Sequence, residues 1–259
     1  MQHPLSSINT DAKIHPSVVI EPFVTIHENV EIGEGTHICS NAVICPGARI
    51  GRNCDIFPGA VVAGIPQDLK FRGEDSIAII GDNTILREFV TINRGTASKG
   101  RTVIGSNTLI MAYSHVGHDC VVGNHVIMSN ATQLAGEVVV DDYAVIGGGT
   151  LIHQFCHIGG HVMIQGGALI NKDIPPYVKA AREPIAFTGI NTVGLHRRGF
   201  TPDTIAAIQE VYRMLYLSNY NITEAIEHIE TELPATPERD AIVAFVRSSE
   251  RGIIRGPHS

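Results

Sequence analysis

The chain has 259 residues, with 19 Lys and Arg against 26 Asp and Glu, and a formal net charge of −7. This balance argues against binding to nucleic acid, whose phosphates attract a basic surface. No apolar run approaches the roughly 20 residues of a transmembrane helix, and the N-terminus lacks the basic and apolar regions of a signal peptide. The five cysteines form no CxxC pair, which predicts a reduced, cytoplasmic protein.

A six-residue repeat dominates residues 8–170. Every sixth residue from Ile8 to Ile170 gives 28 positions, and 25 of them hold Ile, Val, Leu or Met. The residue four places later is small, as at Ala42, Ala48 and Cys54. Gly, Asn and Asp crowd the remaining positions, where tight corners need residues that tolerate a left-handed backbone. The pattern predicts a solenoid built from short strands and corners.

This pattern resembles that of the hexapeptide-repeat acyltransferases. The resemblance implies a mainly β fold, a left-handed parallel β-helix in which three hexads form one coil of 18 residues. Each coil would bury its aliphatic side chains against the next coil. We therefore expect residues that are 18 positions apart to stack on successive coils, about 4.8 Å apart.

Three positions break the aliphatic register, namely Asp68, Glu74 and Ser98. They lie in two stretches, at about 63–79 and 93–103, which keep the six-residue phase but place polar residues where the core is expected. We predict that both stretches leave the β-helix as insertions, because polar residues would be unsatisfied inside it. Loops that project from a rigid scaffold commonly carry function.

The register stops at Ile170, and we assign residues 1–190 to the β-helix and 191–259 to a C-terminal helical domain. Thr201-Pro-Asp is a helix start, with an N-cap, a proline and an early acid. Thr223–Leu233 is predicted as the second helix, and Thr236-Pro-Glu starts the third. Basic residues concentrate in this last third. They form either a solvated surface or a docking site for an acidic partner or a phosphate.

One outward strip combines residues that are suited to catalysis. His118, Gly136 and Gln154 are spaced by 18, and the adjacent column holds Asp119, Glu137 and Phe155. A general base, an orienting carboxylate and a backbone N–H for an oxyanion can act together in such a strip. A single outward histidine is most often an ordinary solvated residue, and we interpret His125 and His161 in that way.

The motifs around this strip resemble those of the UDP-N-acetylglucosamine O-acyltransferases of lipid A synthesis, in the same order and nearly from end to end. The matching segments are Gln67-Asp-Leu-Lys-Phe-Arg-Gly-Glu, Arg94-Gly-Thr, Met111-Ala-Tyr-Ser-His-Val-Gly-His-Asp-Cys, Leu134-Ala-Gly, Ile152-His-Gln-Phe-Cys, Asp173-Ile-Pro-Pro-Tyr, Gly194-Leu-His-Arg-Arg-Gly-Phe and Arg251-Gly-Ile-Ile-Arg.

The resemblance implies a homotrimer that transfers a (R)-3-hydroxyacyl chain from acyl carrier protein to the 3-hydroxyl of UDP-N-acetylglucosamine, the first step of lipid A biosynthesis. It implies no cofactor and no metal. His118 would be the general base, Asp119 would orient it, and Gly136 would supply the oxyanion donor. The implied substrate-binding residues are Gln67, Asp68, Lys70, His115, Glu137, His153, Gln154 and Gly166, with Asn191, Arg197 and Arg198 from a neighbouring subunit.

Three positions depart from the family pattern. Glu137 stands where the family commonly has His, Val193 where a Glu contacts the nucleotide, and Pro184 where a His lies at the end of the acyl groove. Glu137 and Asp119 are one coil apart, so one carboxyl pKa could be raised; alternatively, Glu137 hydrogen-bonds the sugar. The acyl length and a 3-amino in place of a 3-hydroxyl acceptor therefore stay open.

Three other functions remain as alternatives. An acetyl-CoA-dependent sugar acetyltransferase is the nearest, and a non-catalytic scaffold for carrier protein is another. A zinc carbonic anhydrase on the same fold would need histidines from adjacent faces and subunits. His153-x-x-x-His157 and His157-x-x-x-His161 offer the residue type, but this hypothesis leaves the loop motifs unexplained.

Overall fold

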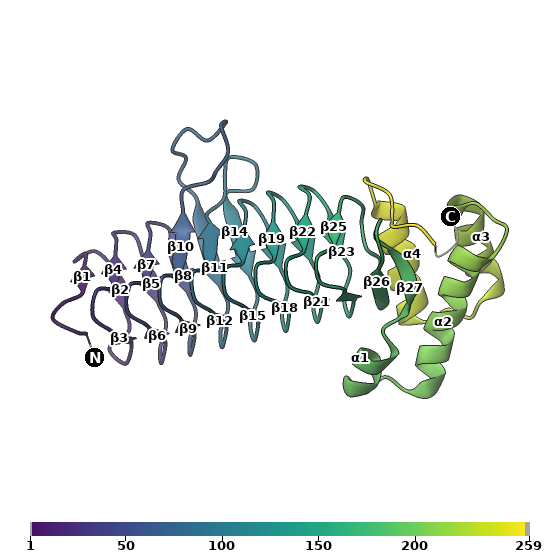
Figure 1. Ribbon diagram of the computed structural model, residues 1–259, viewed down its shortest axis with the longest axis horizontal. Coiled ribbons are helices and arrows are strands. Elements are labelled where there is room, and N and C mark those ends of the chain that lie inside the picture. The colour runs from purple at the N-terminus through teal and green to yellow at the C-terminus, as the bar shows by residue number, and fades with distance from the viewer. Residues whose placement is uncertain (1, 257–259) are drawn as a thin grey trace.

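Three long sheets of very short parallel strands form the faces of a rod, and four helices cover its C-terminal end (Figure 1). This computed structural model describes residues 2–256. The predicted fold, a left-handed parallel β-helix followed by C-terminal helices, is confirmed. No helix of the described residues is long and apolar enough to cross a membrane.

Successive strands of the chain fall on the three sheets in turn. The first sheet consists of β1 (Ser7–Ile8), β4 (Thr25–Ile26), β7 (Val43–Ile44), β10 (Val61–Gly64), β13 (Thr91–Asn93), β16 (His115–Val116), β19 (Gln133–Leu134), β22 (Leu151–Ile152) and β25 (Leu169–Ile170). The second consists of β2 (Lys13–Ile14), β5 (Glu31–Ile32), β8 (Ala48–Ile50), β11 (Ile77–Ile80), β14 (Arg101–Ile104), β17 (Val121–Val122), β20 (Val139–Val140) and β23 (His157–Ile158).

The third sheet consists of β3 (Val19–Ile20), β6 (His37–Ile38), β9 (Asp55–Ile56), β12 (Ile85–Leu86), β15 (Leu109–Ile110), β18 (Ile127–Met128), β21 (Val145–Ile146), β24 (Met163–Ile164), β26 (Val178–Ala181) and β27 (Ala186–Ile190). β26 still pairs in parallel with β24, whereas β27 turns back antiparallel to β26. This reversal ends the winding of the rod.

The aliphatic register forms the core. From Ile20 to Ile170, every aliphatic residue of the register is buried, and so are the small residues four places later. Burial of each such side chain contributes about 1.5–3 kcal/mol, so the stacked aliphatic column is the main source of stability. The same core continues into the helical end, where it includes Tyr212 and Ile242. The division into two domains at residue 190 stays a prediction.

The strand register confirms the spacing of 18 outside the insertions, as where His115 pairs with Gln133. The offset rises to 30 between Val61 and Thr91 and to 24 between Thr91 and His115. Each insertion therefore adds whole hexads, which preserves the inward phase of every later strand. The extra residues leave the rod as loop 65–76 and loop 94–100, between β10 and β11 and between β13 and β14 (Figure 1).

The corners between sheets form three edges of a triangular rod, which we name edge 1–2, edge 2–3 and edge 3–1 after the sheets they join. Most corners contain one residue in the left-handed region, such as Asn41, Asn53 and Asn107. Asp119 (φ 60°) and Glu137 (φ 63°) occupy this position on edge 1–2. Non-glycine residues adopt this backbone rarely, but here it recurs at the same corner position in coil after coil and therefore belongs to the geometry of the rod.

Four helices follow the rod: α1 (Thr192–Arg197), α2 (Pro202–Leu217), α3 (Ile222–Glu232) and α4 (Pro237–Ser248). The three predicted helices are confirmed, and Thr201 and Thr236 cap α2 and α4 as expected. α3 begins slightly earlier than predicted because Asn221 and Glu224 form a capping box. The short helix α1 was not expected. Tyr212 of α2 is fully buried and donates a hydrogen bond to the Pro176 carbonyl (2.5 Å), which joins the helices to the rod.

Candidate active site

Edge 1–2 gathers most of the predicted site residues. Both loops emerge from it, because each lies between a strand of the first sheet and the next strand of the second sheet. The predicted residues on this edge and its loops are Gln67, Asp68, Lys70, His118, Asp119, Gly136, Glu137, His153 and Gln154. His115 lies in β16, immediately before the same edge.

His118 and Asp119 form a close pair at the corner after β16. The Nδ1 atom of His118 lies 2.9 Å from Oδ2 of Asp119. The His118 side chain is 19% exposed, whereas the Asp119 side chain is fully buried. A carboxylate accepts only, so Nδ1 must carry the proton. The Nε2 atom is thereby left as an acceptor, which is the tautomer a general base requires.

Loop 94–100 holds the Asp119 carboxylate. The Thr96 hydroxyl donates to it over 2.6 Å, and the backbone N–H groups of Thr96 and Lys99 donate over 3.0 and 3.2 Å. Burial acts to raise the pKa of Asp119, but the hydrogen bonds from Thr96 and His118 outweigh it and the net pKa is lowered. The possibility that Glu137 raises this pKa is therefore wrong for Asp119, because these donors stabilise its charged form.

Gly136 lies one coil above His118 and leaves room for its ring. A Cβ atom built on Gly136 would overlap Nε2 and Cε1 of His118. Any other residue would therefore displace the imidazole or the backbone. Within residues 2–256 the Gly136 N–H has no hydrogen-bond partner, so it can donate to a bound oxygen atom beside His118.

Glu137 is tied to the same loop. Its carboxylate accepts a hydrogen bond from the Ser98 hydroxyl (3.1 Å) and lies 3.6 Å from Nζ of Lys99. Lys99 also reaches the backbone carbonyl of Asp119 (3.4 Å). Loop 94–100 thus contacts both acidic residues of the strip and sets their positions relative to His118.

His115 and His153 flank the strip. Nδ1 of His115 lies 2.7 Å from the Thr91 hydroxyl, and burial, with a smaller contribution from His118, lowers the pKa of His115. His115 is therefore neutral at physiological pH. His153 and Gln154 are exposed, and Nδ1 of His153 lies 3.1 Å from the Gln154 carbonyl.

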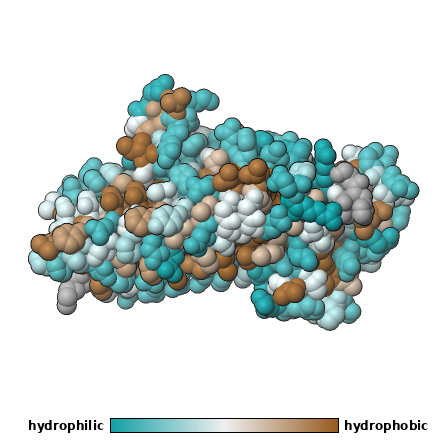
Figure 2. Space-filling view, in the orientation of Figure 1, coloured by the Kyte–Doolittle hydropathy of each residue, from teal (hydrophilic) through white to brown (hydrophobic). Residues whose placement is uncertain are grey.

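Loop 65–76 projects from the rod and carries apolar as well as polar side chains, visible at its tip in Figure 2. Leu69 is 95% exposed, and Gln67 and Lys70 are exposed beside it. The Asp68 carboxylate accepts a hydrogen bond from the Lys70 N–H (2.9 Å), which closes a local turn. The three predicted substrate contacts on this loop are therefore adjacent, with Gln67 and Lys70 exposed and Asp68 half-buried.

The remaining predicted residues lie on other edges. Asn191 is buried and caps α1, and its amide donates to the His161 carbonyl (2.9 Å). Arg198 donates to the Tyr143 carbonyl (2.9 Å), and its guanidinium lies over the Tyr143 ring, while Arg197 is exposed. These contacts place Asn191 and Arg198 against edge 2–3. Gly166 lies on edge 3–1, so one chain does not bring all the predicted residues together.

His161 was predicted to be a solvated surface residue, and this prediction is wrong. Its ring stacks between those of Tyr143 (4.9 Å between centroids) and Tyr177 (5.6 Å). Burial, followed by the charge of Arg198, lowers the pKa of His161 to about 4. The column spacing of 18 predicted the Tyr143 neighbour, but the aromatic residues that follow the last coil enclose the ring. His125, which stacks on Tyr143 from the other side (4.7 Å), is exposed as predicted.

Four residues that support the strip were not predicted as site residues, namely Thr91, Thr96, Ser98 and Lys99. Thr91 stacks next to His115 at an offset of 24 rather than 18. For the others the sequence offered the register break at Ser98 and the Arg94-Gly-Thr motif, which indicated a loop and a family match but not the contacts of that loop.

A zinc site at His153, His157 and His161 has no support in the geometry. His157 pairs with Asp141 (Nε2 to Oδ2, 3.0 Å), and His161 is enclosed by aromatic rings. Over residues 2–256, the one group of three or more His, Cys, Asp or Glu side chains close enough to hold a metal is Glu21, His37 and Cys39, on another edge.

Two family profiles match the chain. Residues 173–254 match "Udp N-acetylglucosamine O-acyltransferase; Domain 2". Residues 11–45, 29–64 and 101–136 match "Bacterial transferase hexapeptide (six repeats)". The first profile covers the helical end and the second covers the rod, so both parts agree with the resemblance seen in the sequence.

Relatives and solved structures match over nearly the whole length. An acyl-[acyl-carrier-protein]–UDP-N-acetylglucosamine O-acyltransferase from Thermodesulfovibrio yellowstonii is 42% identical over 98% of both chains. One from Trichlorobacter lovleyi is 48% identical over 79% of this chain and 80% of its own. The structure of LpxA, a UDP-N-acetylglucosamine acyltransferase from Bacteroides fragilis, is 55% identical with a TM-score of 0.97, covering 98% of this chain and 100% of its own. The chain therefore belongs to the acyl-[acyl-carrier-protein]–UDP-N-acetylglucosamine O-acyltransferase family.

Proposed function

We propose that this protein transfers a (R)-3-hydroxyacyl chain from acyl carrier protein to the 3-hydroxyl of UDP-N-acetylglucosamine, in the first step of lipid A biosynthesis. The family membership supports the reaction class and both substrates. The observation that carries the proposal is the His118–Asp119 pair, which lies against Gly136 on the edge that bears both loops. A sugar hydroxyl bound there could donate its hydrogen bond to Nε2 of His118. The oxygen of the thioester carbonyl could accept one from the unpaired N–H of Gly136.

His118 acts as the general base. Its Nε2 takes the proton of the sugar hydroxyl while the hydroxyl oxygen attacks the thioester carbonyl carbon. The tetrahedral oxyanion accepts a hydrogen bond from the Gly136 N–H, which stabilises the charge that develops there. When the carbon–sulfur bond breaks, the imidazolium returns the proton to the leaving thiolate. Asp119 stays ionised throughout and stabilises the imidazolium.

An apolar surface beside His153 suits the acyl chain. Leu151 and Leu169 of the first sheet are 48% and 55% exposed, and with Ile152, Ile170 and Asn171 they line a shallow cavity next to His153. Fatty acyl chains gain about 0.8 kcal/mol for each methylene that leaves water. Such a surface would therefore favour a long chain over acetyl.

The active site forms between subunits of a homotrimer. His118 lies on edge 1–2, whereas Asn191 and Arg198 lie against edge 2–3, and the second sheet separates the two edges. An aliphatic ladder runs along this sheet, in which Ile79 pairs with Val103, Val103 with Val121 and Val121 with Val139. Three copies that meet at this sheet would place edge 1–2 of one chain beside edge 2–3 of the next.

The nucleotide diphosphate would bind to Arg197 and Arg198 of the neighbouring chain, since a guanidinium offers fixed, paired donors to phosphate oxygens. Glu137 would contact the sugar, because Ser98 and Lys99 hold its carboxylate beside the strip. We also place the protein in the cytoplasm, and its five free cysteines support a reducing compartment.

The test offers the purified protein a series of 3-hydroxyacyl carrier-protein thioesters of increasing length, each with UDP-N-acetylglucosamine or its 3-amino analogue. Acetyl-CoA replaces the thioester in a parallel series, and the products are identified by mass. We expect an O-acylated nucleotide sugar from one chain length. Product from acetyl-CoA alone, or from the 3-amino sugar alone, would replace the proposal with the corresponding alternative.

His118→Ala separates catalysis from carrier-protein binding. General-base catalysis contributes about 10²–10⁴-fold to rate, so we expect kcat to fall by at least that factor while the oligomeric state is unchanged. His15→Ala is the matched control, since His15 is an exposed corner residue of the first coil, several coils away from His118 along the rod. Activity that survives His118→Ala would remove the general base from the proposal, and wild-type protein without any turnover would favour a non-catalytic scaffold.

A further inference from the structure

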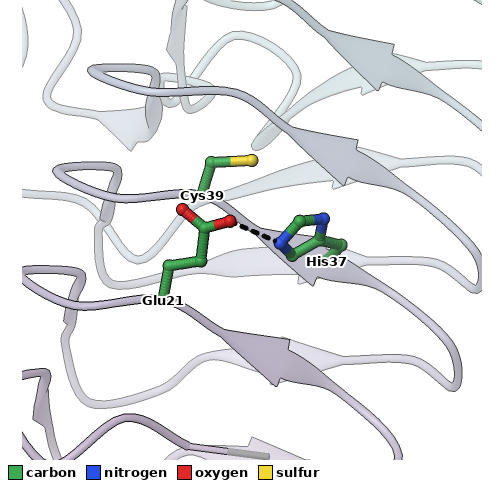
Figure 3. Close-up of side chains that lie close together, drawn as sticks. All are labelled: Glu21, His37 and Cys39. Atoms are coloured by element: carbon green, nitrogen blue, oxygen red, sulfur yellow. Dashed lines mark hydrogen bonds and ion pairs between the residues drawn. The ribbon is translucent and has the colours of Figure 1, made fainter.

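Glu21, His37 and Cys39 form a cluster near the N-terminal end of the rod, on edge 3–1. Glu21 follows β3 of the first coil, whereas His37 in β6 and Cys39 immediately after it belong to the second coil. One ligand atom from each side chain lies within 4.8 Å of the others. Figure 3 shows the carboxylate, the imidazole and the thiol gathered from two successive coils.

The Glu21 carboxylate is already oriented. Its Oε2 accepts hydrogen bonds from both the N–H and the hydroxyl of Ser40 (2.9 Å each), and its Oε1 lies 2.9 Å from Nε2 of His37. Partners of this kind fix ligand geometry in protein metal sites. Bonds of about 2.0–2.3 Å to a tetrahedral zinc ion place neighbouring ligand atoms about 3.3–3.7 Å apart, so modest side-chain rotations would complete the site.

The charges around the thiol favour a cation. Burial raises the pKa of Cys39 to about 11, and the negative charges of Glu21, Asp55 and Glu88 add to this effect. Arg87 offsets part of the charge of Glu88 (2.9 Å). Asp55 pairs with His37 in the next coil. A divalent cation would neutralise this excess of negative charge, and it would bind the Cys39 sulfur in its deprotonated, thiolate form.

We propose that Glu21, His37 and Cys39 bind one zinc ion, which links the first two coils of the β-helix. A mixed set of sulfur, nitrogen and oxygen ligands suits zinc better than magnesium or calcium, which prefer oxygen. Terminal repeats of a solenoid have only one stacking neighbour, so a link between coils has most effect there. Edge 3–1 lies opposite the second sheet, and the site therefore stays accessible in the proposed trimer.

The test uses purified full-length protein that has been stripped of metal with a chelator and then titrated with Co²⁺ as a spectroscopic probe. We expect one equivalent to bind per chain with a cobalt–thiolate charge-transfer band, which Zn²⁺ then displaces. Zinc should also raise the Tm of the wild-type protein. Absence of the band, or a Tm that zinc does not change, would overturn the proposal.

Variants locate the site. Cys39→Ser should abolish the band, and Glu21→Gln, which keeps the side-chain shape, should weaken zinc binding by more than about 100-fold, since loss of an outer partner alone costs roughly 10- to 100-fold. Ser40→Ala should show this smaller loss. Cys45→Ser is the matched control, because Cys45 follows an inward isoleucine in the next hexad and should leave both readouts unchanged. A band that persists in Cys39→Ser, or vanishes in Cys45→Ser, would contradict the assignment.

Discussion

At the scale of single residues, the hydrogen bond between His118 and Asp119 sets which ring nitrogen would face the substrate in the proposed mechanism. Asp119 can fix the proton on Nδ1 because its carboxylate is fully buried and yet ionised. Hydrogen bonds from Thr96, from the Lys99 N–H and from His118 stabilise its negative charge. His157 and Asp141 form a similar pair at 3.0 Å, but Asp141 is 43% exposed and lies on another edge. A histidine–carboxylate contact alone therefore does not support a catalytic role. The proposal for His118 and Asp119 rests in addition on the buried carboxylate and on the adjacent Gly136.

Asp119→Asn should lower kcat by about 10²–10⁴-fold, the range of general acid–base contributions. An amide can donate to Nδ1, which would favour the tautomer with the proton on Nε2 and remove the base. KM for the nucleotide sugar should change little. Steady-state kinetics checks both values, and Glu232→Gln serves as the control because it alters an exposed histidine–carboxylate pair on α3, that of His228 and Glu232. Equal losses in the two variants would contradict this interpretation.

His161 should make stability depend on pH. Its pKa is lowered from 6.5 to about 4, so between these values the unfolded chain binds more protons than the folded chain. The free energy of unfolding must therefore fall as the pH decreases through this window. His161→Phe keeps an aromatic ring between Tyr143 and Tyr177, and we expect its Tm to decrease less on acidification than that of the wild type.

The control for this effect is His125→Phe, because His125 lies in the same aromatic column but is exposed. Thermal melts of both variants and the wild-type protein across the window separate the two histidines. A decrease in Tm that is as steep in His161→Phe as in the wild type would assign the acid sensitivity to carboxylates such as Asp119 instead.

At the scale of elements, loop 94–100 is the part of the site that the repeat does not determine. It adds only six residues to one coil, yet it supplies Thr96 to Asp119 and both Ser98 and Lys99 to Glu137. The two carboxylates occupy equivalent corner positions on adjacent coils. The loop therefore gives them different environments, a buried one for Asp119 and a partly exposed one for Glu137.

Thr96→Val should destabilise the protein and reduce activity together. It removes the 2.6 Å hydrogen bond to Asp119 but keeps the shape of a residue that is 7% exposed. A hydrogen bond to a charged group contributes about 1.5–3 kcal/mol, so the free energy of unfolding should fall by that order. The pKa of Asp119 should rise, because Thr96 is its strongest favourable partner. Activity should consequently be lost at a higher pH on acidification than in the wild type.

Ser98→Ala distinguishes the two carboxylates, since it breaks the contact to Glu137 and leaves those of Asp119 intact. We expect KM for the sugar nucleotide to rise with little change in the acid dependence of kcat. Denaturant melts and pH–rate profiles of both loop variants provide the measurements. An identical response of Thr96→Val and Ser98→Ala would show that the loop acts as one rigid body.

The positions of side chains could be predicted best where the six-residue repeat determines them. The column His118, Gly136 and Gln154 follows from spacing alone, because every hexad must return its aliphatic residue to the core. The break in spacing at Ser98 predicted that loop 94–100 leaves the rod, but not its conformation, which depends on side-chain hydrogen bonds rather than periodicity. It also missed α1, which has only six residues including Gly194, too few for a clear helical pattern.

At the scale of the whole molecule, the rod separates residues that the proposed mechanism requires to act together. His118 lies on edge 1–2, whereas Arg198, the C-cap of α1, lies against edge 2–3, and the whole second sheet separates the two edges. Association of chains can bring edge 1–2 of one chain next to edge 2–3 of another, which a single chain cannot do. The aliphatic ladder from Ile79 to Val139 on the second sheet offers the apolar surface that the proposed trimer would bury.

Subunit complementation tests whether the site is shared. His118→Ala and Arg197→Ala should each be nearly inactive when expressed alone. When they are coexpressed in one cell, mixed trimers contain interfaces in which an intact His118 faces an intact Arg197 of the neighbouring chain, and partial activity should return.

His118→Ala coexpressed with itself under a second tag measures the background. Arg197 is exposed at the end of α1, so its replacement should leave folding intact, and His196→Ala controls for changes to that helix. If both residues served a site within one chain, every chain in the mixture would carry a defect, and no activity above background would appear.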